Sequence, residues 1–150
     1  MKQRDDLRIE PLSEENVAAA AALCAECFSS PWPESVYRRQ IGAPRAVGLV
    51  CMNRDGQAAG FIFCDYVVDE LTLNTVAVAP HYRRQGIAEA LFRQAVSQAA
   101  GICTVCYLEV RESNTAARRL YEKLGFVQNG FRPRYYHDPE EGAVLMEKRL

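Results

Sequence analysis

Hydrophobic and polar positions follow two different periods along this chain, and the changes of period mark the expected elements. Apolar and alternating segments predict four strands in the first half, at residues 7–12, 46–52, 58–68 and 71–79. Two helical patterns separate the first two strands: one is capped by Ser13 and runs to about Phe28, and a shorter one covers residues 36–41. The N-R-D-G segment at residues 53–56 predicts a hairpin turn.

The second half begins with a polar turn and a helix. Apolar residues fall at helical spacing, at positions 87, 88, 91, 92, 95 and 99. A nearly continuous apolar strand follows at residues 103–110, and Asn114 caps a helix that ends at Gly125. Two final strands are expected at residues 126–131 and 143–150. The order β-α-α-β-β-β-α-β-α-β-β predicts an α/β (α+β) fold in which helices flank a mixed sheet.

Composition limits the class of protein. The 150 residues are 49% apolar and 25% charged, with a net charge of −1, which fits one globular domain over residues 1–150 and gives no basic face for nucleic acid. The first residues lack the apolar core of a secretory signal. The longest apolar run is far shorter than the roughly 20 residues that a membrane span requires. We therefore expect a cytoplasmic protein with no membrane or nucleic-acid partner, either a monomer or a weak dimer.

Six cysteines include two C-x-x-C pairs, Cys24/Cys27 and Cys103/Cys106, whose spacing alone is typical of zinc sites. The first pair falls in an alanine-rich helical pattern. The second opens an apolar strand, where positions three apart point to opposite faces. We interpret the cysteines as small buried hydrophobic residues and expect no metal.

The segment at residues 76–88 carries the clearest functional signal. A strand ends, a polar turn follows, and a helix begins at Gly86. The first backbone N–H groups of a helix lack internal partners and form an anion site. Arg83 and Arg84 add positive charge, and the small Ala88 permits close approach. An ordinary strand–turn–helix with solvated arginines explains the spacing equally well.

The R-x-x-G-x-A pattern at residues 83–88 resembles the pyrophosphate-binding motif of the GCN5-related N-acetyltransferase (GNAT) family. The order of elements is also that of the family, and the L-E-V-R-E-S-N and L-Y-E-K-L-G-F segments at residues 108–114 and 120–126 resemble its N-terminal acetyltransferase branch. The resemblance implies a mostly antiparallel sheet flanked by about four helices. It also implies acetyl-CoA as cosubstrate, and as acceptor the N-terminal alanine of a small-subunit ribosomal protein.

Acetyl transfer to an amine needs a base, an oxyanion donor and an acid. An α-amine with a pKa of about 7.7–8.0 is roughly one tenth free base at pH 7, whereas lysine is almost fully protonated. Glu109 is the one carboxylate inside the apolar strand, so we expect it to be half-desolvated and to act as the base through a water. A structural ion pair with Arg111 is the alternative, and Glu70 is the next candidate base.

Tyr121 lies on the inward face of its helix, where packing in the core is the commoner role. The resemblance implies instead that Tyr121 is the general acid and that Asn114 contacts the pantetheine arm. It also implies that the backbone of Val76, Ala77 and Val78 binds pantetheine, with the N–H of Val78 as oxyanion donor. The residues predicted to bind the cofactor are Val76, Ala77, Val78, Arg83, Arg84, Gln85, Gly86, Ile87, Ala88 and Asn114.

The family places its peptide between the first helix–helix turn and the last hairpin, which here implies that Trp32, Tyr135 and Tyr136 line the acceptor groove. Packing of the hairpin onto the core is an equal alternative for these aromatic residues. Three other functions remain open: a GNAT enzyme that acetylates lysine or a small-molecule amine, a CoA-binding module without catalysis, and a zinc-bound interaction domain.

Overall fold

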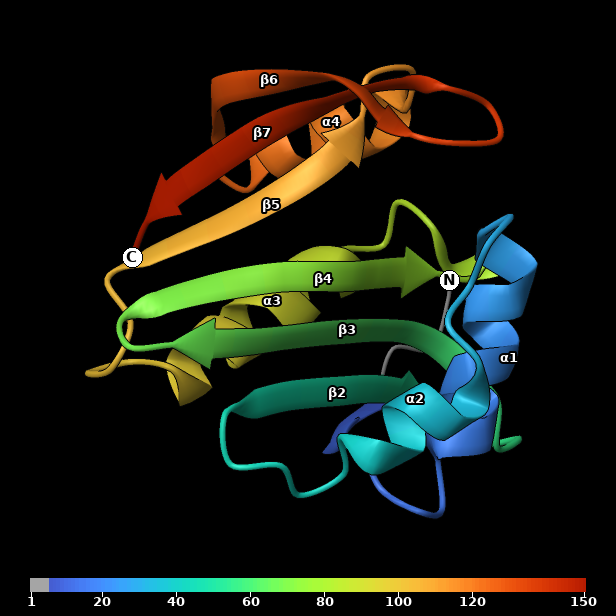
Figure 1. The fold of residues 1–150 in the computed structure, drawn as a ribbon. Helices are drawn as coiled ribbons and strands as arrows, with labels where there is room; N and C mark the ends of the chain where they lie inside the picture. The colour runs from blue at the N-terminus through green and yellow to red at the C-terminus, as the bar shows by residue number, and fades with distance from the viewer. Residues whose placement is uncertain (1–5) are drawn as a thin grey trace.

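The computed structural model describes residues 6–150, and within this range the strands form one seven-stranded sheet in the order β1-β2-β3-β4-β5-β7-β6 (Figure 1). The strands are β1 (Arg8–Pro11), β2 (Ala46–Met52), β3 (Ala58–Val67), β4 (Glu70–Val78), β5 (Val105–Arg111), β6 (Val127–Tyr136) and β7 (Glu141–Arg149). The helices are α1 (Val17–Cys27), α2 (Glu34–Arg39), α3 (Ile87–Gln98) and α4 (Thr115–Lys123). Among the strands of residues 6–150, only β4 and β5 pair in parallel, which confirms the predicted order and the mixed, mostly antiparallel sheet.

The sheet carries a hydrophobic core on each face. Along β3, Phe61 and Phe63 pack with α1 and α2, whereas Ile62 and Cys64 pack with α3. This distribution follows from the two-residue period of a strand, because both faces of β3 are covered by helices.

The packing of α3 depends on a glycine in β3. A Cβ atom at Gly60 would lie 2.7 Å from Cγ2 of Ile87 and 3.1 Å from Cδ1 of Leu91. Only glycine therefore lets the first turn of α3 lie this close to the sheet. The contact fixes the start of α3 beside the end of β4, where the predicted anion site lies.

The beginning of α1 differs from the prediction. The helix starts at Val17 and not directly after Ser13. The buried Asn16 side chain explains the difference, because its Oδ1 accepts from the N–H of Ser13 at 2.8 Å and its Nδ2 donates to the carbonyl of Pro11 at 3.0 Å. These bonds stabilise a turn ahead of the helix.

Two strands also have boundaries that the pattern did not predict. β6 continues through Tyr136, past the predicted end at Phe131, with register shifts against β7 that interrupt a regular hydrophobic alternation. β5 begins at Val105, so Cys103 precedes the strand. Among residues 6–150, no helix is long and apolar enough to cross a membrane.

Candidate active site

The site begins where β4 and β5 separate. The two strands pair over only three residues each, from Glu70 and Val105 to Thr72 and Tyr107. Beyond this segment β4 contains a bulge at Asn74, the extra residue between the partners of Phe63 and Cys64. Because a bulge bends its strand, β4 leaves β5, and a cavity of about 640 Å³ opens between them.

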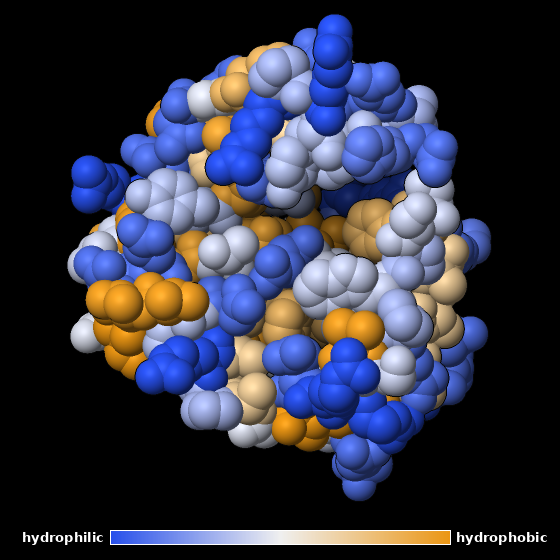
Figure 2. All heavy atoms as spheres, in the orientation of Figure 1, coloured by the Kyte–Doolittle hydropathy of each residue, from blue (hydrophilic) through white to orange (hydrophobic). Residues whose placement is uncertain are grey.

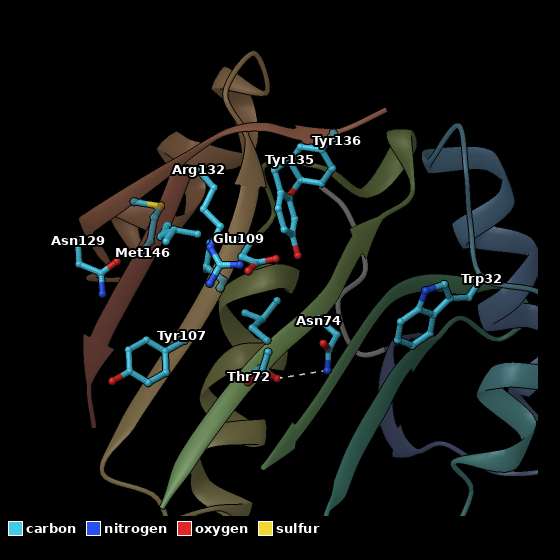
Figure 3. A pocket seen from close by; sticks show the side chains of 13 residues that line it. Trp32, Thr72, Asn74, Tyr107, Glu109, Asn129, Arg132, Tyr135, Tyr136 and Met146 are labelled. Atoms are coloured by element: carbon cyan, nitrogen blue, oxygen red, sulfur yellow. Dashed lines mark hydrogen bonds between the residues drawn. The ribbon is translucent and has the colours of Figure 1, made fainter. Parts of the chain in front are cut away.

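Residues from both strands and from the last hairpin surround this cavity (Figure 3). Its lining consists of Trp32, Thr72, Leu73, Asn74, Tyr107, Leu108, Glu109, Asn129, Arg132, Tyr135, Tyr136, Leu145 and Met146. The structure thus brings together the predicted base, Glu109, and the three aromatic residues predicted to line the acceptor groove, Trp32, Tyr135 and Tyr136. In Figure 2 this face is hollowed near its centre, with hydrophobic atoms in part of the floor.

Glu109 is exposed, which corrects the expectation of a half-buried carboxylate. The opening between the strands leaves its side chain without a covering element. It forms no ion pair with any residue in the described range, and Arg111 pairs instead with Glu141 at 3.0 Å. The alternative pairing of Glu109 with Arg111 is therefore wrong. Glu70, the other candidate base, is the first residue of β4, at the closed end of the opening, and does not line the cavity.

Two tyrosines of β6 form the wall beside Glu109. Their rings pack edge to face with centroids 5.0 Å apart. A hydrogen bond to the Glu109 carboxylate is the main cause that raises the pKa of Tyr135. Burial, followed by the charge of Glu109, raises the pKa of Tyr136 to about 12. Both hydroxyls are therefore protonated near pH 7 and can donate to a ligand in the cavity.

Trp32 forms the opposite side of the cavity. Its ring lies 5.4 Å from the ring of Tyr37 and 6.2 Å from that of Phe63, so one side packs on the core. The side chain is nevertheless 42% exposed. An anchored aromatic ring with a free face provides a rigid apolar surface for a ligand.

Sequence reasoning missed Thr72, Asn74, Tyr107, Asn129 and Arg132 as lining residues. Asn74 is the most informative of them: its Nδ2 donates to Asp65 Oδ1 at 3.0 Å, which leaves Oδ1 available to the cavity (Figure 3). The polar residues at alternate positions of β4 were the available signal for Thr72 and Asn74. Arg132 was hidden because the pattern ended β6 one residue earlier.

The turn before α3 has the backbone of an anion site. Arg84 and Gly86 both adopt left-handed conformations, with φ of 64° and 81°. No backbone N–H from Arg84 through Glu89 donates to an acceptor within residues 6–150, and no side chain caps the helix. Gln85 Oε1 is buried without a partner in the same range. Free, convergent N–H groups at a helix start fit a pyrophosphate.

The arginine side chains of this turn are arranged differently from one another. Arg83 Nε donates to the carbonyl of Val78 at 3.0 Å, and its guanidinium lies 3.9 Å from Cys27 Sγ. Arg83 therefore folds back over the end of β4. The sequence had predicted instead that its side chain adds charge beside the phosphates. Arg84 is exposed.

Tyr121 lies on the opposite side of the sheet from Trp32, within the core that α3 covers, and does not line the cavity. It is 8% exposed, and burial is the main cause that raises its pKa. Its hydroxyl has no hydrogen-bond partner among residues 6–150 but is not sealed from solvent. Asn114 caps α4 as predicted, since its Oδ1 accepts from the N–H of Ala117 at 3.1 Å.

The six cysteines are free thiols, and five are buried. Burial raises the pKa of Cys24 to about 11 and that of Cys106 to about 12. Within the described residues, no group of three or more His, Cys, Asp or Glu side chains is arranged to hold a metal ion.

The sequence pattern of the family described as "Acetyltransferase (GNAT) family" matches residues 17–126, a range that includes the separating strands β4 and β5 and the helix start with free N–H groups. The chain belongs to this family.

Individual relatives are more specific. The chain is 34% identical over 142 residues to the "[Ribosomal protein bS18]-alanine N-acetyltransferase" of Escherichia coli strain K12, covering 92% of this chain and 94% of that one. It is 30% identical over 157 residues to the "N-alpha-acetyltransferase RimI" of Mycobacterium tuberculosis, covering 96% and 93%. The crystal structure of the Escherichia coli ribosomal-protein-S18-alanine N-acetyltransferase superposes with a TM-score of 0.83 at 32% identity, covering 95% and 93%.

Proposed function

We propose that this protein transfers the acetyl group of acetyl-CoA to the N-terminal α-amine of a protein, an alanine of ribosomal protein bS18. The name and the near-complete coverage of the Escherichia coli relative support this acceptor. The observation that carries the proposal is the cavity where β4 leaves β5, which joins an exposed, unpaired carboxylate to an aromatic groove. Residues 1–150 act as one catalytic domain in this proposal.

Bound acetyl-CoA supplies the acetyl group as a thioester. The N–H groups of the turn from Arg84 to Ala88 hold its pyrophosphate, and the free edge of β4 at Val76–Val78 pairs with the pantetheine arm. Asn114, at the start of α4, contacts the same arm. The N–H of Val78 donates to the carbonyl oxygen on which negative charge develops.

The remaining residues act on the acceptor and on the leaving sulfur. Glu109 takes a proton from the attacking amine, directly or through a water, and Asn74 Oδ1 accepts from the same amine. Tyr121, kept protonated by burial, donates its proton to the departing sulfur. Trp32, Tyr135 and Tyr136 bind the first residues of the peptide.

An α-amine suits an exposed base. With a pKa of about 7.7–8.0 it is partly neutral at pH 7, whereas a lysine side chain, with a pKa of about 10.4, is almost entirely protonated and depends more on a base to remove its proton. The exposed Glu109 therefore favours the N-terminal acceptor over a lysine.

A thiol-release assay with acetyl-CoA and a panel of acceptors tests the proposal. The panel contains the bS18 N-terminal peptide, the same peptide with a blocked N-terminus, a lysine peptide and small amines. Release with the free N-terminal peptide alone supports the proposal. Release with lysine or small amines instead favours another acceptor, and acetyl-CoA binding without release with any acceptor favours a CoA-binding module.

A further inference from the structure

We propose that Arg111 and Glu141 form a positioning pair that holds the acceptor side of the groove in place, an inference that rests on the proposed function. Neither residue lines the cavity. They lie where β5 ends and β7 begins, so both can act on the loop between β6 and β7.

Arg111 donates to three residues in or at the end of the loop between β6 and β7. Its Nη1 donates to Glu141 Oε1 and to the carbonyl of Pro139, and its Nη2 donates to the carbonyl of His137, each at 3.0 Å. These bonds tie both sides of the loop at residues 137–141 to the end of β5. A planar guanidinium can satisfy this arrangement because its donors are fixed in one fork.

The same guanidinium supports a groove residue directly. The Cζ atom of Arg111 lies 4.4 Å from the centre of the Tyr136 ring. Tyr136 lines the cavity together with Glu109 and packs against Tyr135, whose pKa the Glu109 carboxylate raises. A continuous set of contacts therefore leads from Arg111 through two tyrosines to the proposed base.

Glu141 is held from the other side. Its carboxylate accepts from the backbone N–H and the hydroxyl of Ser113, both at 3.0 Å. These bonds, with Arg111, lower the pKa of Glu141, so the pair stays charged near neutral pH. Ser113 directly precedes Asn114, the N-cap of α4, so its bonds to Glu141 connect the loop between β6 and β7 to the start of α4. Arg111 and Glu141 thus join Tyr136, on the wall of the cavity, to the helix that carries Tyr121.

The test uses two conservative variants, Arg111→Lys and Glu141→Gln. A lysine keeps the charge but loses the fork and the flat surface under Tyr136. Steady-state kinetics with an N-terminal alanine peptide should show KM for the peptide raised about tenfold, with kcat and acetyl-CoA affinity within about twofold. Arg54→Lys, at an exposed arginine paired with Asp6, is the matched control and should change neither constant.

Calorimetry with acetyl-CoA and thermal melting establish that each variant is folded. An unchanged peptide KM, or a fall in kcat at an unchanged KM, overturns the inference. Loss of the folded state in both variants also overturns it, because the pair would then be structural. If the wild-type protein acetylates no peptide N-terminus, the proposed function fails; if it does and both variants behave like wild type, only this inference fails.

Discussion

Arg111 lies two residues from Glu109 on the same strand, yet its guanidinium pairs with Glu141 on the neighbouring strand at 3.0 Å. The Glu109 carboxylate therefore forms no ion pair among residues 6–150, and its charge contributes to the raised pKa of the neighbouring Tyr135. A carboxylate locked in an ion pair is a weak base, since the pair stabilises its charged form. This arrangement keeps Glu109 available for an incoming amine.

Replacing Glu109 with glutamine should leave acetyl-CoA binding intact and reduce kcat by about 10²–10³-fold, because the side chain keeps its shape but no longer accepts a proton. Calorimetry and steady-state kinetics at pH 7 measure the two effects. Glu70→Gln, at the closed end of the opening, is the control and should retain full activity. Equal rates for wild type and Glu109→Gln would remove Glu109 from the mechanism.

The Tyr121→Phe variant should turn over about 10–100-fold more slowly with unchanged acetyl-CoA affinity, because it lacks only the proton for the departing sulfur. Its melting temperature should match that of wild type, since the hydroxyl has no partner to lose among the described residues. Single-turnover kinetics and thermal melting give both values. Full activity in this variant would leave Tyr121 with packing as its role.

A pair of glycine variants separates backbone strain from ligand binding. Gly86 and Gly101 have the same φ of 81°, so alanine at either position should cost about 1–2 kcal/mol of stability. Only Gly86→Ala should weaken acetyl-CoA binding, by about tenfold, because it distorts the N–H groups at the start of α3. Calorimetry compares the two proteins. Equal affinities would argue against this turn as the pyrophosphate site.

The stability of the protein should fall as the pH rises above about 9. Burial raises the pKa of the Cys24 thiol from 9.0 to about 11 and that of Cys106 to about 12. An unfolded chain releases these protons from about pH 8.5, whereas the folded protein retains them, so ionisation favours the unfolded state. The stabilisation is complete below pH 8.5 and is lost progressively up to about pH 12.

Calorimetric melting between pH 7 and pH 11 under reducing conditions tests this dependence. The melting temperature should decline continuously over the alkaline half of the range, and Cys24→Ala should decline less steeply than wild type. A melting temperature that stays constant to pH 11 would contradict the effect of the buried thiols.

Most of the fold could be predicted from the sequence because its elements have strong local signals. The helical stripe that begins at Ile87 and the N-cap of Asn114 agree with the structure. The start of α1 could not be predicted, since it depends on contacts of one buried side chain, that of Asn16. The extent of β6 depends on its pairing with β7 through two register shifts, which leave no period in the sequence.

The sequence predicted several residues that line the candidate site but not its geometry. Motifs pointed to Glu109, which lines the cavity, and to the turn before α3, whose N–H groups are free within residues 6–150; their roles stay predictions. The bulge at Asn74, which opens the sheet, arises from pairing with β3 and has no local signal. The exposure of Glu109 and the pairing of Arg111 follow from that opening and from the last hairpin, so sequence spacing alone suggested the wrong partner.

Tandem mass spectrometry of a single peptide distinguishes acetylation of an N-terminal α-amine from acetylation of a lysine. The peptide begins with alanine, contains an internal lysine, and is incubated with the protein and acetyl-CoA. We expect one acetyl group on the α-amine of the first residue, formed about 10²–10³-fold more slowly when Glu109→Gln replaces wild type. An acetyl group on the lysine, or no acetyl group at all, would contradict this expectation.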